Sequence, residues 1–121
     1  MSPTVLIVED DPDTREMLTS FLQLEGFQTA TASNGREALD RLTGDVNADV
    51  IVLDLMMPVM DGRSFREQQL QNPGLATIPT IVFSAYRDVA KTAGELNAAG
   101  HLAKPLKLPD LLRTVRQYCQ G

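Results

Sequence analysis

Short apolar runs rich in β-branched residues alternate with longer amphipathic stretches, and this alternation constrains the fold more than any other feature of the chain. The runs predict five strands, at Thr4–Val8, Phe27–Thr31, Asp49–Leu53, Pro79–Phe83 and Gly100–Ala103. The other stretches predict five helices, at Asp11–Glu25, from Asn34 to about Leu42, at Gly62–Leu70, from about Asp88 to Ala98, and at Pro109–Tyr118. Such an alternation is typical of an α/β fold, a parallel sheet covered by helices on both faces. The near-continuous hydrophobicity of the first, third and fourth strands places them in the middle of the sheet.

Local signals at the helix ends support these boundaries. Gly26 is placed to end the first helix in a left-handed conformation, Asn34 can cap the second, and Pro109 suits the first turn of the last. Apolar residues at helical spacing are expected to mark the buried side of the first helix: Met17, Leu18, Phe21, Leu22 and Leu24.

Composition limits the kind of protein this can be. The chain has 121 residues, 43% hydrophobic and 22% charged, which predicts one globular domain over residues 1–121. Its net charge of −5 argues against a nucleic-acid-binding surface. The single cysteine, Cys119, excludes an internal disulfide and a cysteine-based zinc cluster. No apolar stretch approaches the ~20 residues that cross a bilayer, so we expect a cytoplasmic protein.

Three consecutive carboxylates, Glu9, Asp10 and Asp11, follow the first strand. Ligands of open parallel sheets bind at the carboxyl ends of the strands, so this position is informative. Asp11 precedes Pro12 and is explained by capping of the next helix. Glu9 and Asp10 are not needed for a cap, and clustered carboxylates are the usual ligands of a hard divalent cation.

Asp54 follows the third strand inside an apolar segment, Val50–Met57. An ionised carboxylate in such surroundings is costly unless it is paired or binds a cation. The turn signals, Pro58 and Asp61-Gly62, come later in the chain, so Asp54 is poorly placed to be a turn residue. A functional carboxylate is the better interpretation.

The fourth and fifth strands end in Ser84 and Lys104. Either residue alone has an ordinary reading, a turn hydroxyl or a solvated ammonium. Lys104 directly precedes Pro105, however, and a cis bond there would fix the direction of the lysine, which could then bind a phosphoryl oxygen. An acidic cluster, a semi-buried aspartate, a hydroxyl and a lysine together supply the parts needed for phosphoryl transfer to a carboxylate.

Four segments carry a family resemblance: Val5–Asp11, Val52–Gly62, Phe83–Ala85 and His101–Leu106. In this order, each at a predicted strand end, they resemble the receiver domain of bacterial two-component response regulators over essentially the whole chain. The resemblance implies a flavodoxin-like, doubly wound five-stranded sheet of order 2-1-3-4-5.

The resemblance also implies a metal site. Asp10 and Asp54 would bind Mg²⁺, or Mn²⁺, directly, with the backbone carbonyl of Met56 and waters completing the shell. Glu9 would act mainly through a coordinated water.

For the chemistry, the resemblance implies that Asp54 accepts phosphate from a histidine kinase or a phosphotransfer protein. Ser84 would hydrogen-bond the phosphoryl group, and Lys104 would pair with its oxygens. Pro58 and Gly62 would shape the loop after the acceptor.

The output implied by the resemblance is a conformational shift of the face made by the fourth helix, the fifth strand and the fifth helix. This face would contact a downstream protein or an output domain, with a phosphorylation-dependent homodimer as a further option. The chain would be a switch rather than an enzyme, catalysing only its own phosphoryl uptake and slow loss. Met56 and Tyr86 supply no acid or amide to align a hydrolytic water, so we expect slow self-dephosphorylation.

His101 departs from the family pattern, in which a Tyr or Phe three residues before the lysine acts as a rotameric switch. A partly exposed strand residue and a switch residue are both open readings of His101. A histidine switch would respond to pH, and a ratio of active to inactive conformers that stays flat between mildly acidic and mildly alkaline pH would contradict it.

Three other functions compete with a phosphorylated switch. A haloacid-dehalogenase-type phosphatase normally has a second Asp two residues after the nucleophile, where this chain has Met56. A flavodoxin-like electron carrier needs a Ser/Thr/Gly-rich phosphate loop in place of Glu9–Asp11. A receiver-like docking module that is never phosphorylated is the strongest alternative. The intact set of Asp54, Asp10, Ser84 and Lys104 argues against it.

Overall fold

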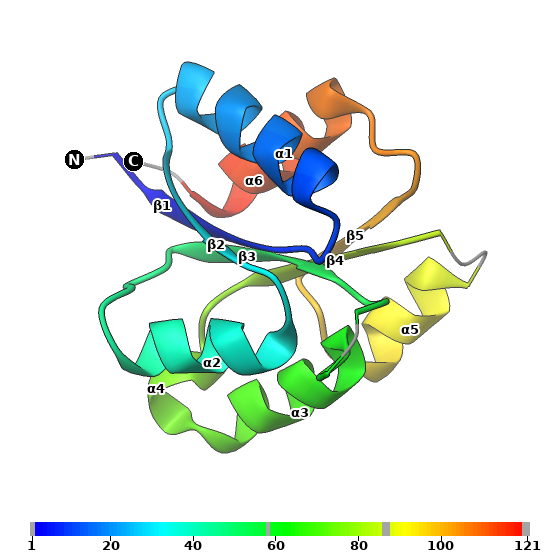
Figure 1. Ribbon diagram of the computed structural model, residues 1–121. Coiled ribbons are helices and arrows are strands. Elements are labelled where there is room, and N and C mark those ends of the chain that lie inside the picture. Colours follow the sequence, from blue (N-terminus) through cyan, green and yellow to red (C-terminus); the bar gives the residue numbers. More distant parts are fainter. Residues whose placement is uncertain (1, 58, 86–87, 120–121) are drawn as a thin grey trace.

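The computed structural model describes residues 2–57, 59–85 and 88–119. Five parallel strands form one sheet of order β2-β1-β3-β4-β5, which confirms the predicted α/β fold and the central position of the first, third and fourth strands (Figure 1). The strands are β1 (Thr4–Val8), β2 (Gln28–Ala32), β3 (Val50–Asp54), β4 (Thr80–Ser84) and β5 (Gly100–Ala103). β1 and β5 have the predicted bounds, and the other three begin and end one residue later than predicted.

The helices are α1 (Pro12–Leu24), α2 (Gly35–Thr43), α3 (Gly62–Gln71), α4 (Pro73–Ala76), α5 (Val89–Glu95) and α6 (Leu108–Tyr118). The prediction of five helices missed α4, a single turn that is too short to show a helical hydrophobic period. Its start is a local signal: the Asn72 side chain accepts a hydrogen bond from the Gly74 N–H, and Pro73 occupies the first turn. In the described ranges, none of the helices is long and apolar enough to cross a membrane.

Helices cover both faces of the sheet. α1 and α6 lie on one face, and α2, α3, α4 and α5 lie on the other (Figure 1). Alternate residues of the strands therefore enter two separate cores. Val5 and Ile7 pack with Leu18 and Leu22 of α1, whereas Leu6 and its neighbours pack with the opposite layer.

The predicted buried side of α1 was partly wrong. Leu18 and Leu22, one helical turn apart, are fully buried, but Met17 is 45% and Leu24 is 85% exposed. One helix that packs on a sheet buries a narrow stripe, and residues at both edges of the proposed side lie outside it. The end signals were right: Gly26 has φ 96°, and the Asn34 side chain caps α2 by accepting from the Glu37 N–H.

Candidate functional site

The carboxyl ends of β1, β3 and β5 bring three charged side chains together. Glu9 and Asp54 are 0% and 1% exposed, and Lys104 lies over them. The Lys104 Nζ lies 3.3 Å from Glu9 Oε1 and 3.2 Å from Asp54 Oδ2. One ammonium therefore serves two buried carboxyl groups at this edge of the sheet.

The position of Lys104 is fixed by its backbone and by a neighbouring ring. Its N–H donates to the Ser84 carbonyl at 2.9 Å, which continues the β4–β5 pairing past the end of β5. The Lys104–Pro105 bond is cis, as the sequence suggested. The ammonium also lies 5.1 Å from the centre of the Phe83 ring.

The pKa values of Glu9 and Lys104 are shifted by burial and by the neighbouring charges. Burial, followed by the hydrogen bond and charge of Asp54, raises the pKa of Glu9 to about 8, although Lys104 opposes the shift. Burial disfavours the charged form of Lys104, but the carboxylates of Asp54 and Glu9 outweigh it, so the pKa of Lys104 is raised. The lysine of the site thus stays charged, and the Glu9 carboxyl is harder to ionise than an exposed one.

The turn after β1 carries the acidic residues that the sequence singled out. Asp11 caps α1 by accepting from the Thr14 N–H at 3.1 Å, and the hydrogen bonds from Thr14 lower the pKa of Asp11. The Asp10 N–H donates to Glu9 Oε2 at 3.0 Å. These contacts confirm Asp11 as a cap and leave Glu9 and Asp10 for the site.

Sequence reasoning missed Arg15, whose Nη1 donates to the Glu9 carbonyl at 2.9 Å and, more weakly, to the Asp10 carbonyl at 3.4 Å. This guanidinium holds the backbone of the two acidic residues from the first turn of α1. A cation near a helix N-terminus opposes the helix dipole, and that anomaly could have marked it.

The loop between β3 and α3 follows Asp54 directly. The Met56 N–H donates to Asp54 Oδ1 at 3.0 Å, so one carboxylate oxygen is held by the backbone while the other faces Lys104. The Gly62 N–H donates to the Leu55 carbonyl at 3.2 Å and closes the loop at its base. Pro58, predicted to shape this loop, lies outside the described residues.

Ser84 is the last residue of β4 and is fully buried, beside the end of β3. His101 is exposed within β5, in register with Val82 rather than at the strand end, so it lies apart from the acidic group. The exposed-residue reading of His101 fits this position, and its switch role stays a prediction. Tyr86 lies outside the described residues.

The donors at this edge fit a hard divalent cation. Glu9, Asp10 and Asp54 each offer a carboxylate oxygen, and these oxygens lie within 4.8 Å of one another. Two of the three acids are buried and Asp10 is exposed, so the group opens to solvent on one side. Magnesium binds to such oxygen ligands, needs one or two carboxylates, and keeps several waters.

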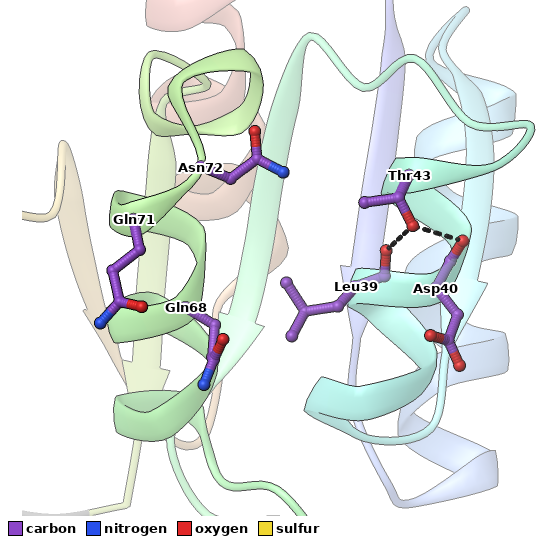
Figure 2. A pocket seen from close by; sticks show the side chains of 6 residues that line it. All are labelled: Leu39, Asp40, Thr43, Gln68, Gln71 and Asn72. Carbon is purple, nitrogen blue, oxygen red and sulfur yellow. Dashed lines mark hydrogen bonds between the residues drawn. The ribbon is translucent and has the colours of Figure 1, made fainter.

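A polar groove between α2 and α3 lies on the helical layer rather than at the strand ends (Figure 2). It is lined by Leu39, Asp40, Thr43, Gln68, Gln71 and Asn72. The Thr43 hydroxyl donates to the Leu39 and Asp40 carbonyls of its own helix, at 2.9 and 3.3 Å, so its hydrogen is used within α2 (Figure 2). Among the described residues, the group of three acids that could hold a metal ion lies at the strand ends instead.

Comparisons with known proteins agree with this geometry. The family model for the response regulator receiver domain matches residues 5–116. The response regulator MprA of Mycolicibacterium vanbaalenii is 36% identical over 118 residues, which cover 96% of this chain and 50% of MprA. The regulatory protein AtoC of Escherichia coli is 35% identical, with 96% of this chain and 25% of AtoC covered. The chain thus spans half or less of the length of these two relatives.

Solved structures give the same result. The chemotaxis response regulator CheY4 of Vibrio cholerae has a TM-score of 0.89 and 30% identity, covering 98% of this chain and 99% of that one. The response regulator TrrA of Thermotoga maritima, solved in complex with Mg²⁺ and BeF, has a TM-score of 0.85 and 28% identity, with 96% and 98% covered.

Proposed function

Because this chain belongs to the response regulator receiver domain family, we propose that Asp54 is the residue that takes the phosphoryl group. The observation that carries the proposal is its setting: a carboxylate that is 1% exposed at the end of β3, with Oδ1 held by the Met56 N–H and Oδ2 facing Lys104. A buried carboxylate held at both oxygens is oriented for one direction of attack. A second acid, Glu9, shares the same lysine at 3.3 Å and would stand beside a bound cation.

In the proposed step, an Asp54 carboxylate oxygen forms a bond to phosphorus. The bond from phosphorus to the donor's imidazole nitrogen, or to the acyl oxygen of acetyl phosphate, breaks, and the leaving group keeps the electron pair. Lys104 transfers its ion pair from Asp54 to the new phosphoryl oxygens. Ser84, at the end of the next strand, donates its hydroxyl hydrogen to one of those oxygens.

Glu9, Asp10, Asp54 and the Met56 carbonyl would hold the cation that this chemistry needs. When bound, Mg²⁺ neutralises the negative charge that collects on the carboxylates and the phosphoryl oxygens. Mn²⁺, which also takes oxygen ligands, would serve at the same position.

The donor is proposed to be a histidine kinase or a phosphotransfer protein. The receiving face is the one predicted from the sequence, which is formed by α5, β5 and α6 now that α4 is counted. A downstream protein, an output domain or a second copy of the chain would dock there after phosphorylation. The chain would catalyse its own phosphoryl uptake and slow loss, and no other reaction.

The decisive experiment compares three proteins with acetyl phosphate, in Mg²⁺ and in EDTA, by intact mass. The wild type is expected to gain one phosphoryl group in Mg²⁺ only, and Asp54→Asn to gain none, because an amide cannot attack phosphorus. Asp40→Asn, which changes an exposed acid on α2, is the matched control and should behave as the wild type. Equal labelling of Asp54→Asn would assign the acceptor to another carboxylate. An unlabelled wild type that also ignores beryllofluoride would favour the docking module.

Slow self-dephosphorylation is the second expectation for the phosphorylated protein. Met56 is half exposed, and its thioether cannot activate a water for attack on phosphorus. Phosphate release followed after removal of the donor should therefore be slow in Mg²⁺ and should accelerate in Met56→Glu or Met56→Gln. Rapid release by the wild type, without any phosphatase, would contradict this.

A further inference from the structure

Gly35, the first residue of α2, lies against the β3–α3 loop. Its N–H donates to the Met60 carbonyl at 3.0 Å. The first N–H groups of a helix have no partner within the helix, so this carbonyl satisfies a donor that α2 would otherwise leave unpaired. Asn34 caps the Glu37 N–H of the same turn. The loop is thereby bonded to the beginning of α2, a helix from a distant part of the chain.

The space around Gly35 explains why a glycine stands there. A Cβ added at this position would lie 2.8 Å from Met60 Cγ, 3.0 Å from Met60 Sδ and 2.9 Å from the Met60 carbonyl oxygen. The methionine side chain could rotate away, but the carbonyl belongs to the backbone and moves only with the loop. Among the described glycines only Gly26 has a positive φ, so Gly35 is not required for an unusual conformation. Close approach, rather than conformational freedom, accounts for it.

A second glycine, Gly62, fixes the other side of the same loop. A Cβ there would lie 2.6 Å from the Asp54 carbonyl oxygen and 2.7 Å from Leu55 Cα. Its N–H donates to the Leu55 carbonyl at 3.2 Å. The loop that begins at the acceptor strand is therefore held at its base by Gly62 and at its flank by Gly35.

From these contacts we propose that Gly35 is a positioning residue for the phosphoryl site, because it sets the β3–α3 loop and with it the Met56 backbone. This inference rests on the magnesium site proposed above. The Met56 N–H bonds to Asp54 Oδ1, so a shift of the loop reaches the acceptor carboxylate through that bond. The same shift would move the Met56 carbonyl, which would hold the cation.

The test is Gly35→Ala, with Gly94→Ala as the matched control. A Cβ at Gly94, within α5, would meet nothing within 4 Å, so this change adds the same methyl group to a helix without a contact. Both substitutions replace glycine with the better helix former. If Gly35 merely began a helix, both variants would melt a few degrees above the wild type and bind Mg²⁺ unchanged.

The positioning role gives a different result for Gly35→Ala. We expect its Mg²⁺ dissociation constant to rise roughly 10-fold, as for other residues that orient metal ligands indirectly. Titrations followed by amide NMR suit this protein, which has no tryptophan. In EDTA, the amides of Met56 and Met60 should shift in Gly35→Ala and stay in place in Gly94→Ala. Thermal melts with and without Mg²⁺ give a second measure, because a ligand of the native state raises the melting temperature.

Met60→Ala separates the contact with the Met60 side chain from the contact with its carbonyl. It also covers the case in which Gly35→Ala does not fold. It removes the side-chain atoms at 2.8 and 3.0 Å and leaves the carbonyl at 2.9 Å. Adding Gly35→Ala to Met60→Ala should therefore still weaken Mg²⁺ binding, because the contact with the backbone carbonyl remains. If Gly35→Ala is unfolded, the double variant takes its place: weaker Mg²⁺ binding than in Met60→Ala supports the positioning role, and unchanged binding, or a double variant that also unfolds, refutes it.

Each negative result would overturn a different claim. A wild type that does not bind Mg²⁺ would overturn the proposed metal site, and this inference with it. A wild type that binds Mg²⁺ with the same affinity as Gly35→Ala would overturn the inference alone. A penalty that disappears in the Met60→Ala background would also overturn it, because contact with the Met60 carbonyl, which belongs to the loop backbone, would then not be the cause.

Discussion

Two groups of polar side chains are buried at opposite ends of the sheet, and they are built differently. At the carboxyl ends, Glu9 and Asp54 share the ammonium of Lys104, and these three residues are called the open group below. At the amino end of β4, Arg66 and Gln69 of α3 meet Thr80, and these three are 4%, 0% and 0% exposed. The first group has more acids than cations. The second has one cation and only neutral acceptors.

The group of Arg66, Gln69 and Thr80, called the closed group below, has its one charge hydrogen-bonded to neutral neighbours. Its guanidinium donates to the carbonyls of Leu96 and Asn97, at 3.0 and 2.7 Å, and to Gln69 Oε1 at 2.8 Å. Gln69 in turn donates to the carbonyls of Leu75 in α4 and of Ile78 just after it. The ion pairs found among the described residues do not include Arg66. The guanidinium thus ties α3 to the end of α5, where carbonyls carry the negative end of the helix dipole.

The difference teaches how to interpret a buried charge. A charge whose hydrogen bonds are all made by neutral neighbours supports the fold and gains nothing from a ligand. A charge crowded by a like charge and open on one side is relieved when a cation binds. Burial alone would have marked both groups as functional, and the sign of the surrounding charge separates them.

The largest effect is expected at the closed group. Arg66→Leu removes the donor to two backbone carbonyls that stay buried, so it should lower the free energy of unfolding by about 3 kcal/mol. Arg63→Met is the control, because Arg63 makes a surface pair with Glu95 at 3.3 Å, both about half exposed. That variant should lose less than about 0.5 kcal/mol. Urea denaturation measures both, and similar losses would mean that water already reaches Arg66.

A smaller change of opposite sign is expected at the open group. In EDTA, Asp54→Asn removes one of two crowded acids and leaves Glu9 paired with Lys104, so it should raise the free energy of unfolding by about 1 kcal/mol. Asp61→Asn is the matched control, since Asp61 caps α3 at 2.8 Å and asparagine caps equally well. With Mg²⁺ added, the wild type should gain stability and Asp54→Asn should not. A destabilised Asp54→Asn in EDTA would show that the lysine pair outweighs the crowding, and the contrast between the groups would disappear.

The open group was largely predictable from the sequence, and the closed one was not. Glu9, Asp10, Asp54 and Lys104 stand next to apolar strands, and the topology of a parallel sheet is enough to bring strand ends together. The central strands and the end signals at Gly26 and Asn34 followed from equally local patterns.

The closed group leaves almost no such signal. Arg66 and Gln69 fall on the buried side of α3 beside Phe65, while the apolar Leu70 is 42% exposed, so hydrophobicity does not single out the buried side of this helix. The carbonyls that accept hydrogen bonds from the buried Arg66 guanidinium lie about thirty residues away in the chain. Backbone acceptors of that kind have no sequence signature, and the same holds for the Met60 carbonyl that faces Gly35.

Each region has one non-glycine residue with a positive φ, and the two residues differ in how well they tolerate it. The smallest change in the free energy of unfolding is expected here. Val59, in the loop beside the acidic group, has φ 68° and is 84% exposed, whereas Asn97, which bonds Arg66, has φ 53°. A β-branched residue is disfavoured in the left-handed region, but asparagine tolerates it. Val59→Gly should therefore raise the free energy of unfolding by about 0.5 kcal/mol, after the entropy of the unfolded glycine is subtracted. Asn97→Gly should change it by less than about 0.3 kcal/mol. Equal gains in urea denaturation would show that strain is shared by both regions, whereas a gain confined to Val59→Gly would place the strain in the loop beside the acidic group.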